Sequence, residues 1–297
     1  MIAHLGLTTI KQISSNLSIQ VNQDNFEFLV INHPKFDAAF ALHGAHLVHF
    51  QIKGQAPLIY TSSNAIYSAD KAIRGGVPIC WPWFGSTVET KQKNLPSHGF
   101  ARTSKWQLND TSENEQGVDI EFLFASNSET KSVWNNDFQV TLKAQLTDQI
   151  KLTLVTKNTG DQGFTYRGAL HSYLHIGDIK QFAVNGLAST YSDSLDHGVI
   201  KNTQQPAYPS GPIDAIFAVN EGDIVLEDKA NQRNITIRNQ GNDSVVVWNP
   251  WEEGAKAFVD MPDDGYKTMF CVESAITAKQ GVYVAPNQQH CLQTVIK

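Results

Sequence analysis

Glu273 could do chemistry because it is the one charged residue in an otherwise apolar segment, residues 268–274. On a β-strand its carboxylate would share a face with Cys271 and Met269. Burial among apolar side chains raises the pKa of a carboxyl group, which suits a general base that works near neutral pH. The alternative is a structural ion pair with a lysine or an arginine, and spacing alone does not separate the two.

Two arginines stand where they could bind an anion. Arg74 precedes Gly75-Gly76 in an apolar segment, so it needs either a structural carboxylate or an anionic ligand as its partner. Arg102 follows His98 by four residues, in a loop marked by proline and glycine. Two fixed guanidinium groups can clamp a phosphate, whereas a loop histidine alone is usually solvated or hydrogen-bonded. No Gly-Lys-Ser/Thr follows residues 73–85 at the distance that a phosphate-binding P-loop needs.

The aromatic group Trp81, Trp83 and Phe84 follows the two glycines. These side chains could stack on a sugar ring, but aromatic residues in such a segment more often belong to the core, and we favour the core.

The histidines do not predict a metal site, although there are 10 of them. His43, His46 and His49 are spaced by three in a segment that reads as a strand, where His46 faces away from the other two. His171 and His175 would lie about 13 Å apart on a strand, too far to share a metal ion. Cys80, Cys271 and Cys291 form no Cys-x-x-Cys pair, so we expect three buried thiols in a reducing cytoplasm.

The composition describes a globular protein with a large core. The 297 residues include 41% hydrophobic residues and carry 23 Lys and Arg against 29 Asp and Glu, a formal net charge of −6. These values exclude a disordered chain, and the overall acidity argues against a nucleic-acid partner. No stretch is long and apolar enough to span a membrane, and the N-terminus lacks the basic region of a secretory signal. We therefore expect a cytoplasmic protein.

Period-two alternation over residues 138–154 predicts a β-hairpin with one buried face. Similar short runs recur along the chain, separated by turn signals, at residues 26–31, 40–52, 120–124, 224–226, 235–237, 245–248, 267–273 and 282–285. No run of ten residues has a convincing helical stripe. We expect a mainly β fold, a large antiparallel β-sandwich with very few short helices, formed by one domain over residues 1–297. The polar first 25 or so residues suggest an edge strand or a lid.

Seven segments, in order, resemble the hexose-6-phosphate mutarotases (glucose-6-phosphate 1-epimerases), a branch of the aldose 1-epimerase family. Each is weak alone, but their order is specific: Arg-Gly-Gly-Val-Pro at 74–78, Trp-Pro-Trp-Phe-Gly at 81–85, His-Gly-Phe-Ala-Arg at 98–102, Ala-Leu-His-Ser-Tyr at 169–173, Ile-Asp-Ala-Ile-Phe at 213–217, Trp-Asn-Pro-Trp at 248–251, and Gly-Tyr-Lys at 265–267 running into Cys-Val-Glu at 271–273. The chain departs from the pattern at Ser97, where some relatives carry glutamine, and at Ser274, where proline is more common.

This resemblance implies a β-sandwich that binds a sugar on its concave face and needs no metal or organic cofactor. It implies His171 as the general acid and Glu273 as the general base, acting from opposite sides of the sugar ring. It implies Arg74 and Arg102 as ligands of the 6-phosphate or of nearby hydroxyl groups. The remaining implied sugar contacts are His98 and Asp214.

The activity that the resemblance implies is interconversion of the α and β anomers of a hexose 6-phosphate, with D-glucose 6-phosphate as the first candidate, by a monomer. The alternatives are a mutarotase for neutral aldoses, a non-catalytic carbohydrate-binding protein on the same fold, and a regulator that binds a sugar phosphate as a signal.

Overall fold

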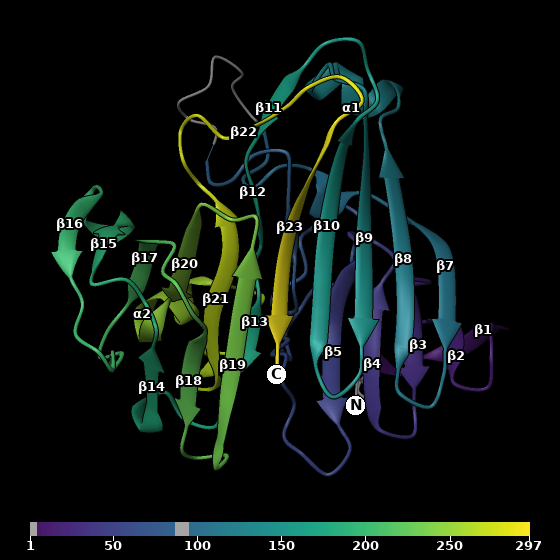
Figure 1. The fold of residues 1–297 in the computed structure, drawn as a ribbon. Helices are drawn as coiled ribbons and strands as arrows, with labels where there is room; N and C mark the ends of the chain where they lie inside the picture. Colours follow the sequence, from purple (N-terminus) through teal and green to yellow (C-terminus); the bar gives the residue numbers. More distant parts are fainter. Residues whose placement is uncertain (1–4, 87–94) are drawn as a thin grey trace.

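The computed structural model describes residues 5–86 and 95–297. Three large antiparallel sheets, which we name after one strand of each, dominate the fold (Figure 1). The β3 sheet has the order β1 (Thr8–Gln12), β2 (Leu17–Val21), β3 (Glu27–Asn32), β4 (Phe36–Ala41) and β5 (His46–Ile52). Its outermost strand is β1, an edge strand, which was one of the two alternatives for the N-terminal segment. Residues 1–4, which contribute to the expectation of no secretory signal, lie outside the described residues.

The β10 sheet is the longest layer of the molecule. Its order is β14 (Phe182–Asn185), β18 (Ile224–Asp228), β19 (Arg233–Gln240), β23 (Gln289–Ile296), β10 (Ile150–Asn158), β9 (Phe138–Leu146), β8 (Val118–Ala125) and β7 (Gln107–Glu113).

The β21 sheet has the order β16 (Val199–Asn202), β15 (Thr190–Asp193), β17 (Ile213–Ala218), β20 (Ser244–Asn249), β21 (Met269–Ile276), β12 (Gly168–Leu170) and β6 (Ile79–Cys80), with β13 (Tyr173–His175) also paired to β21. A two-stranded sheet joins β11 (Phe164–Tyr166) to β22 (Val282–Val284). The described helices are short: α1 (Ser128–Val133), α2 (Trp251–Ala257), and the 3₁₀ turns η2 (Ala101–Thr103), η3 (Ile179–Gln181), η4 (Ser194–Asp196) and η5 (Gly265–Thr268).

Strands β9 and β10 form the predicted hairpin. Leu146 pairs with Ile150 across the turn, and buried residues alternate with less buried ones along β10. This alternation puts one face of the β10 sheet in the core, as period two requires.

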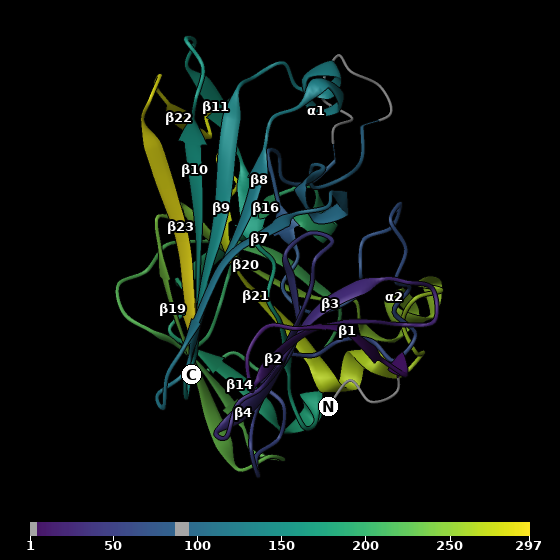
Figure 2. The same ribbon diagram turned by 90° about the vertical axis from the view of Figure 1, so that its right-hand side faces the viewer.

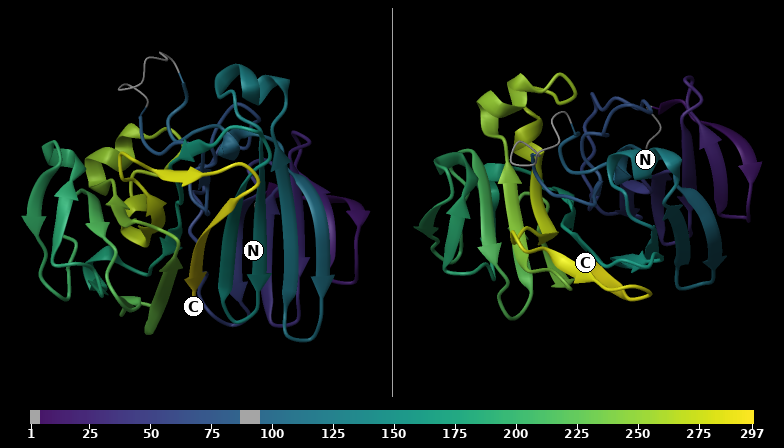
Figure 3. Two further views of the ribbon diagram at one scale, coloured as in Figure 1. Left: turned by 45° about the horizontal axis from the view of Figure 1, so that its top comes forward. Right: turned by 90° about the horizontal axis from the view of Figure 1, so that it is seen from above.

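The other two large sheets pack on that same face of the β10 sheet. The Phe40 ring of the β3 sheet lies 5.2 Å from Phe122, and the Phe270 ring of the β21 sheet lies 4.8 Å from Phe182. Figure 2 shows the side that carries the β3 sheet, and Figure 3 shows from above how the β3 and β21 sheets lie next to each other behind the β10 sheet. The predicted antiparallel β-sandwich is therefore confirmed. The prediction of one domain stays a prediction.

Strand β21 is buried along its whole length, and its two faces differ. Phe270 and Ser274 face the β10 sheet, where the Ser274 hydroxyl donates a hydrogen bond to the Gln293 carbonyl. Glu273 therefore projects from the opposite face, away from the β10 sheet.

Three expected strands differ in extent. The segment 40–52 breaks into β4 and β5, because Gly44 (φ +78°) and Ala45 (φ +45°) turn the chain between them. The strand on which we expected His171 and His175 is interrupted at His171 and Ser172, and residues 267–268 belong to η5 in place of β21. Among the described residues, no helix is long and apolar enough to cross a membrane.

Candidate active site

The face of the β21 sheet that points away from the β10 sheet brings His171 and Glu273 into contact. Nε2 of His171 lies 3.2 Å from Oε1 of Glu273, with side-chain exposures of 11% and 1%. His171 stands where β12 gives way to β13, and its backbone amide donates to the Pro78 carbonyl. Since Tyr173 of β13 pairs with Cys271 of β21, the break between the two short strands turns the imidazole toward the carboxyl group.

Burial decides the protonation of this pair. It raises the pKa of Glu273 well above its usual range, and the charge of Asp214 adds to the effect, although Arg102 opposes it. Burial also lowers the pKa of His171 well below its usual range, helped by the charges of His98, Arg102 and Arg74. Both shifts favour the uncharged forms of the two groups, a pair that together holds one proton. The Oε2 atom of Glu273 is buried with no hydrogen-bond partner among the described residues.

Aromatic side chains fix the plane of the imidazole. The Tyr173 ring stacks on His171 with centroids 4.9 Å apart and an interplanar angle of 12°. Trp248 of β20 meets both rings edge-on, at 6.3 Å from His171 and 5.8 Å from Tyr173. Because the ring is held on its face and at its edge, Nε2 keeps its direction toward Glu273.

Arg74 has the structural carboxylate that the sequence left open. Its Nε lies 3.1 Å from Oδ1 of Asp260, and its guanidinium carbon lies 4.1 Å above the centre of the Phe258 ring. Nη1 donates to the Tyr173 hydroxyl at 3.4 Å. Gly75 (φ +102°) follows, and a Cβ there would lie 2.6 Å from the Tyr60 carbonyl, so only glycine permits this turn.

The loop from Leu95 to Arg102 supplies the other cationic side of the site. Nη2 of Arg102 donates to the Ser97 carbonyl at 2.8 Å. Ser97, where some relatives carry glutamine, thus contacts Arg102 through its backbone. Nδ1 of His98 accepts from the Gly85 amide at 3.3 Å, which leaves Nε2 as the protonated nitrogen. Burial and the Arg102 charge lower the pKa of His98 to about 4, so its imidazole is a neutral hydrogen-bond donor at neutral pH.

Asp214 lies on the same face of the sheet as Glu273, two strands away. It pairs with Trp248 of β20, which pairs with Cys271 of β21, so the Asp214 and Cys271 backbones lie about 10 Å apart. Burial raises the pKa of Asp214, a hydrogen bond with Ser194 lowers it, and the charge of Asp193 raises it. The structure thus gathers all six residues expected at the site on one side of the β21 sheet: Arg74, His98, Arg102, His171, Asp214 and Glu273.

Comparisons with known proteins identify the family of this chain. The model of the family described as "Aldose 1-epimerase" matches residues 27–297. This chain belongs to the aldose 1-epimerase family. The expectation of an epimerase is therefore confirmed.

Individual relatives match most of the chain. The Escherichia coli (strain K12) protein named "Putative glucose-6-phosphate 1-epimerase" is 34% identical over 292 residues, 98% of this chain and 96% of its own length. A Cenchrus ciliaris protein with the same name is 31% identical over 82% of this chain and 75% of its own length. The crystal structure of a mutarotase from Salmonella typhimurium, "putative" in its description, superposes with a TM-score of 0.92 at 31% identity, over 99% of this chain and 97% of that one.

Sequence reasoning about this epimerase missed several residues that hold the site. Asp260 lies 186 positions after Arg74, and neither its spacing nor its neighbours marked it. Phe258 was equally unmarked, whereas Tyr173 stood in a recognised segment without a role. The signal that could have led to Asp260 is the partner that a half-buried arginine needs.

The expectations for the aromatic and cysteine residues hold in part. Trp81 is fully buried in the core and donates to the Thr156 hydroxyl at 3.1 Å, while Trp83 and Phe84 are half-buried. Cys80 and Cys271 are buried as expected, but Cys291 is exposed, because its side chain lies on the outer face of β23. Among the residues described, no three His, Cys, Asp or Glu side chains gather as a metal-ligand set would.

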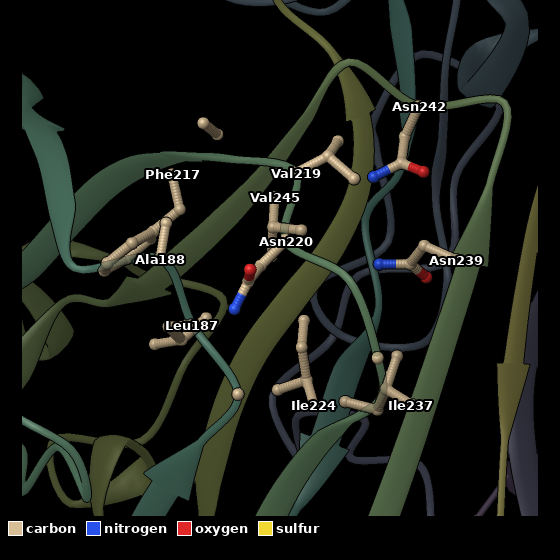
Figure 4. Close-up of a pocket in the computed structure, with 13 residues that line it drawn as sticks. Leu187, Ala188, Phe217, Val219, Asn220, Ile224, Ile237, Asn239, Asn242 and Val245 are labelled. Atoms are coloured by element: carbon tan, nitrogen blue, oxygen red, sulfur yellow. The ribbon is translucent and has the colours of Figure 1, made fainter.

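A separate cavity of about 30 Å³ lies at the ends of β17, β18 and β19 (Figure 4). Its lining includes Phe217, Ile237 and Asn239 and none of the six site residues. The Asn239 amide atoms are buried with no partner in the described part of the chain, so the cavity suits one or two ordered waters and is too small for a sugar.

Proposed function

We propose that this epimerase interconverts the α and β anomers of a hexose 6-phosphate, with D-glucose 6-phosphate as the first candidate. The observation that carries the proposal is the buried contact of 3.2 Å between His171 and Glu273, beside Arg74 and Arg102. The name that the relatives from Escherichia coli and Cenchrus ciliaris share, glucose-6-phosphate 1-epimerase, supports the phosphorylated substrate.

Glu273 acts as the general base and His171 as the general acid. The reaction starts when the proton that the pair holds moves from Glu273 to His171, which gives a carboxylate and an imidazolium. The carboxylate removes the proton of the anomeric hydroxyl, and the imidazolium protonates the ring oxygen as the bond from that oxygen to the anomeric carbon breaks. The open aldehyde rotates about the bond between its first and second carbons. Reclosure reverses both proton transfers, so each group returns to its starting state.

The contact between the two groups differs from the expected arrangement, in which acid and base stood on opposite sides of the ring. Oxygen O1 and the ring oxygen are bonded to the same carbon, so they are neighbours. An acid and a base that touch each other can therefore serve both oxygens from one side, with Oε2 of Glu273 available for the anomeric hydroxyl.

Arg74 and Arg102 couple phosphate binding to the pKa of the general acid, His171. The charges of Arg102 and Arg74 are among the causes that lower the pKa of His171. A phosphate dianion bound to these guanidinium groups would offset their charge and raise the pKa of His171 toward the imidazolium that the reaction needs. We assign sugar-hydroxyl contacts to His98, through its Nε2–H, and to Asp214, as an acceptor.

The test is the rate of anomer exchange of glucose 6-phosphate, followed by NMR, with wild-type protein, His171→Asn and Glu273→Gln. We expect wild type to accelerate exchange, and each variant to lose about 10²- to 10⁴-fold in kcat while sugar binding persists, because each removes one proton-transfer group. His197→Asn is a matched control, since His197 is exposed at φ +52°, a conformation that asparagine tolerates. Glu253→Gln is the control for the carboxylate, as its side chain is 88% exposed.

Each contrary result points to one alternative. Wild-type protein that leaves the spontaneous exchange rate unchanged would exclude the enzyme and favour a carbohydrate-binding or regulatory protein. Faster exchange of glucose than of glucose 6-phosphate would favour a mutarotase for neutral aldoses. Cytoplasmic location and a monomeric state remain predictions.

A further inference from the structure

Three groups from distant parts of the chain determine the orientation of the Arg74 guanidinium. Asp260 accepts from Nε at 3.1 Å, the Phe258 ring covers one face at 4.1 Å, and the Tyr173 hydroxyl accepts from Nη1 at 3.4 Å. The side chains of Arg74 and Asp260 are 21% and 17% exposed, so the pair is largely shielded from solvent. A planar guanidinium held at its Nε edge and on one face has a single orientation, and its remaining Nη donors are left for another partner.

The backbone around Asp260 is also fixed. Ser62, which is 1% exposed, donates its hydroxyl to the Asp260 carbonyl at 2.7 Å, and its amide donates to the Arg74 carbonyl at 3.1 Å. One buried serine thus connects the backbones of two residues that are 186 positions apart. The segment of Phe258 and Asp260 between α2 and η5 is therefore hydrogen-bonded, through Ser62, to the backbone of Arg74.

The alternative is that the ion pair between Arg74 and Asp260 only stabilises the fold. Partly exposed ion pairs contribute little to the free energy of unfolding. Two observations favour a role in the site. The arginine contacts the Tyr173 hydroxyl, and the Tyr173 ring stacks on His171. In addition, Asp260 occupies only the Nε edge, which leaves the Nη groups directed elsewhere.

We propose that Asp260 is a positioning residue: it fixes the guanidinium of Arg74 so that its Nη groups face the anionic group of the substrate. This inference rests on the proposed function, because Arg74 is taken to bind the hexose 6-phosphate. Asp260 acts through Arg74 and does not itself contact the substrate.

The experiment compares wild type with Asp260→Ala, Asp260→Asn and the control Asp263→Asn, which removes the same charge from an exposed side chain nearby. The measurements are KM and kcat for glucose 6-phosphate, the Kd of inorganic phosphate by calorimetry, and the melting temperature. For Asp260→Ala we expect KM and Kd to rise about tenfold, as for the loss of one charge-assisted anchor, with kcat within about threefold because His171 and Glu273 are untouched. For Asp260→Asn we expect both constants to stay within about threefold of wild type, since the amide oxygen still accepts from Nε.

Near-normal KM and Kd in Asp260→Asn, together with raised values in Asp260→Ala, would distinguish a positioning role of Asp260 from a purely structural one. Asp260→Ala with KM and Kd within twofold of wild type would overturn the proposal, as would equal losses in kcat for both Asp260 variants together with a lower melting temperature. If wild type is inactive on glucose 6-phosphate but the phosphate Kd follows the expected order, the proposed function fails and the positioning role stands. If wild type neither turns over the sugar nor binds phosphate, both fail.

Discussion

At the scale of single residues, a carboxyl group and an imidazole in contact usually form an ion pair, but burial of both reverses this for Glu273 and His171. Removing both charges from water costs more than their attraction returns unless further hydrogen bonds satisfy them, and Oε2 of Glu273 has no such bond among the described residues. The neutral pair is therefore favoured. Each group is then within one proton transfer of the state that catalysis needs.

The shared proton predicts how stability depends on pH. In the unfolded chain Glu273 ionises near its ordinary pKa of 4.5 and His171 loses its proton near 6.5. The folded pair keeps one proton across this range. The unfolded state thus binds more protons below pH 4.5, equally many between 4.5 and 6.5, and fewer above 6.5. Above pH 6.5 the contribution of the pair should fall by about 1.4 kcal/mol per pH unit until the folded pair releases its proton.

The measurement is the free energy of unfolding of wild type and of His171→Asn/Glu273→Gln, by denaturant titration at several pH values. The double variant should gain stability relative to wild type as the pH rises above 6.5. A difference that stays constant from neutral to alkaline pH would show that the pair does not hold an extra proton in the folded state.

At the scale of elements, the turn between β18 and β19 joins the β10 sheet to the rest of the molecule. Asp228, whose side chain is 0% exposed, accepts from Nε of Arg233 at 3.1 Å. The same arginine donates to the carbonyls of Ala56, Pro57 and His175, at 2.7 to 2.8 Å. His175 ends β13, which begins two residues after His171, so this buried pair also supports the position of the site.

Arg233→Met should destabilise the protein by about 3–5 kcal/mol, because it leaves the buried Asp228 carboxylate without its cation. Arg238→Met is the matched control on the same strand. Arg238 pairs with Asp223, but its side chain is 71% exposed, so its loss should cost at most about 1 kcal/mol. The measurement is the free energy of unfolding of both variants by chemical denaturation. Equal losses of stability in Arg233→Met and Arg238→Met would contradict the prediction that burial of the Asp228 pair makes its loss more costly.

At the scale of the whole molecule, one continuous apolar core contacts all three large sheets. Smaller apolar clusters, one around Phe28 on the β3 sheet and one around Val246 on the β21 sheet, lie outside this core, but both sheets also contribute residues to it. We therefore expect one cooperative thermal transition, with the calorimetric enthalpy equal to the van't Hoff enthalpy. Two resolved transitions would contradict the prediction that residues 1–297 form one domain.

The overall charge matters less than its local arrangement. The chain carries −6, yet Arg74 and Arg102 both act on His171 at the site. Charges more than about 10 Å apart on the surface are largely screened at 0.1 M salt. An acidic protein can therefore present a cationic site to an anionic substrate.

The class of fold follows from the sequence alone, because the period-two alternation of residues 138–154 specifies which face of a strand is buried. It also marked Glu273 as a carboxylate in an apolar strand and Arg74 as a cation in need of a partner. These properties are local, because neighbouring side chains determine them, and they can therefore be predicted from one sequence.

The tertiary structure alone decided which groups meet. Asp260 reaches Arg74 across 186 positions, and the interruption at His171 brings the imidazole to 3.2 Å from Glu273 where a continuous strand was expected. Such pairings depend on how sheets pack and where strands break. They are properties of the whole set of long-range contacts, and no local pattern of residues specifies them.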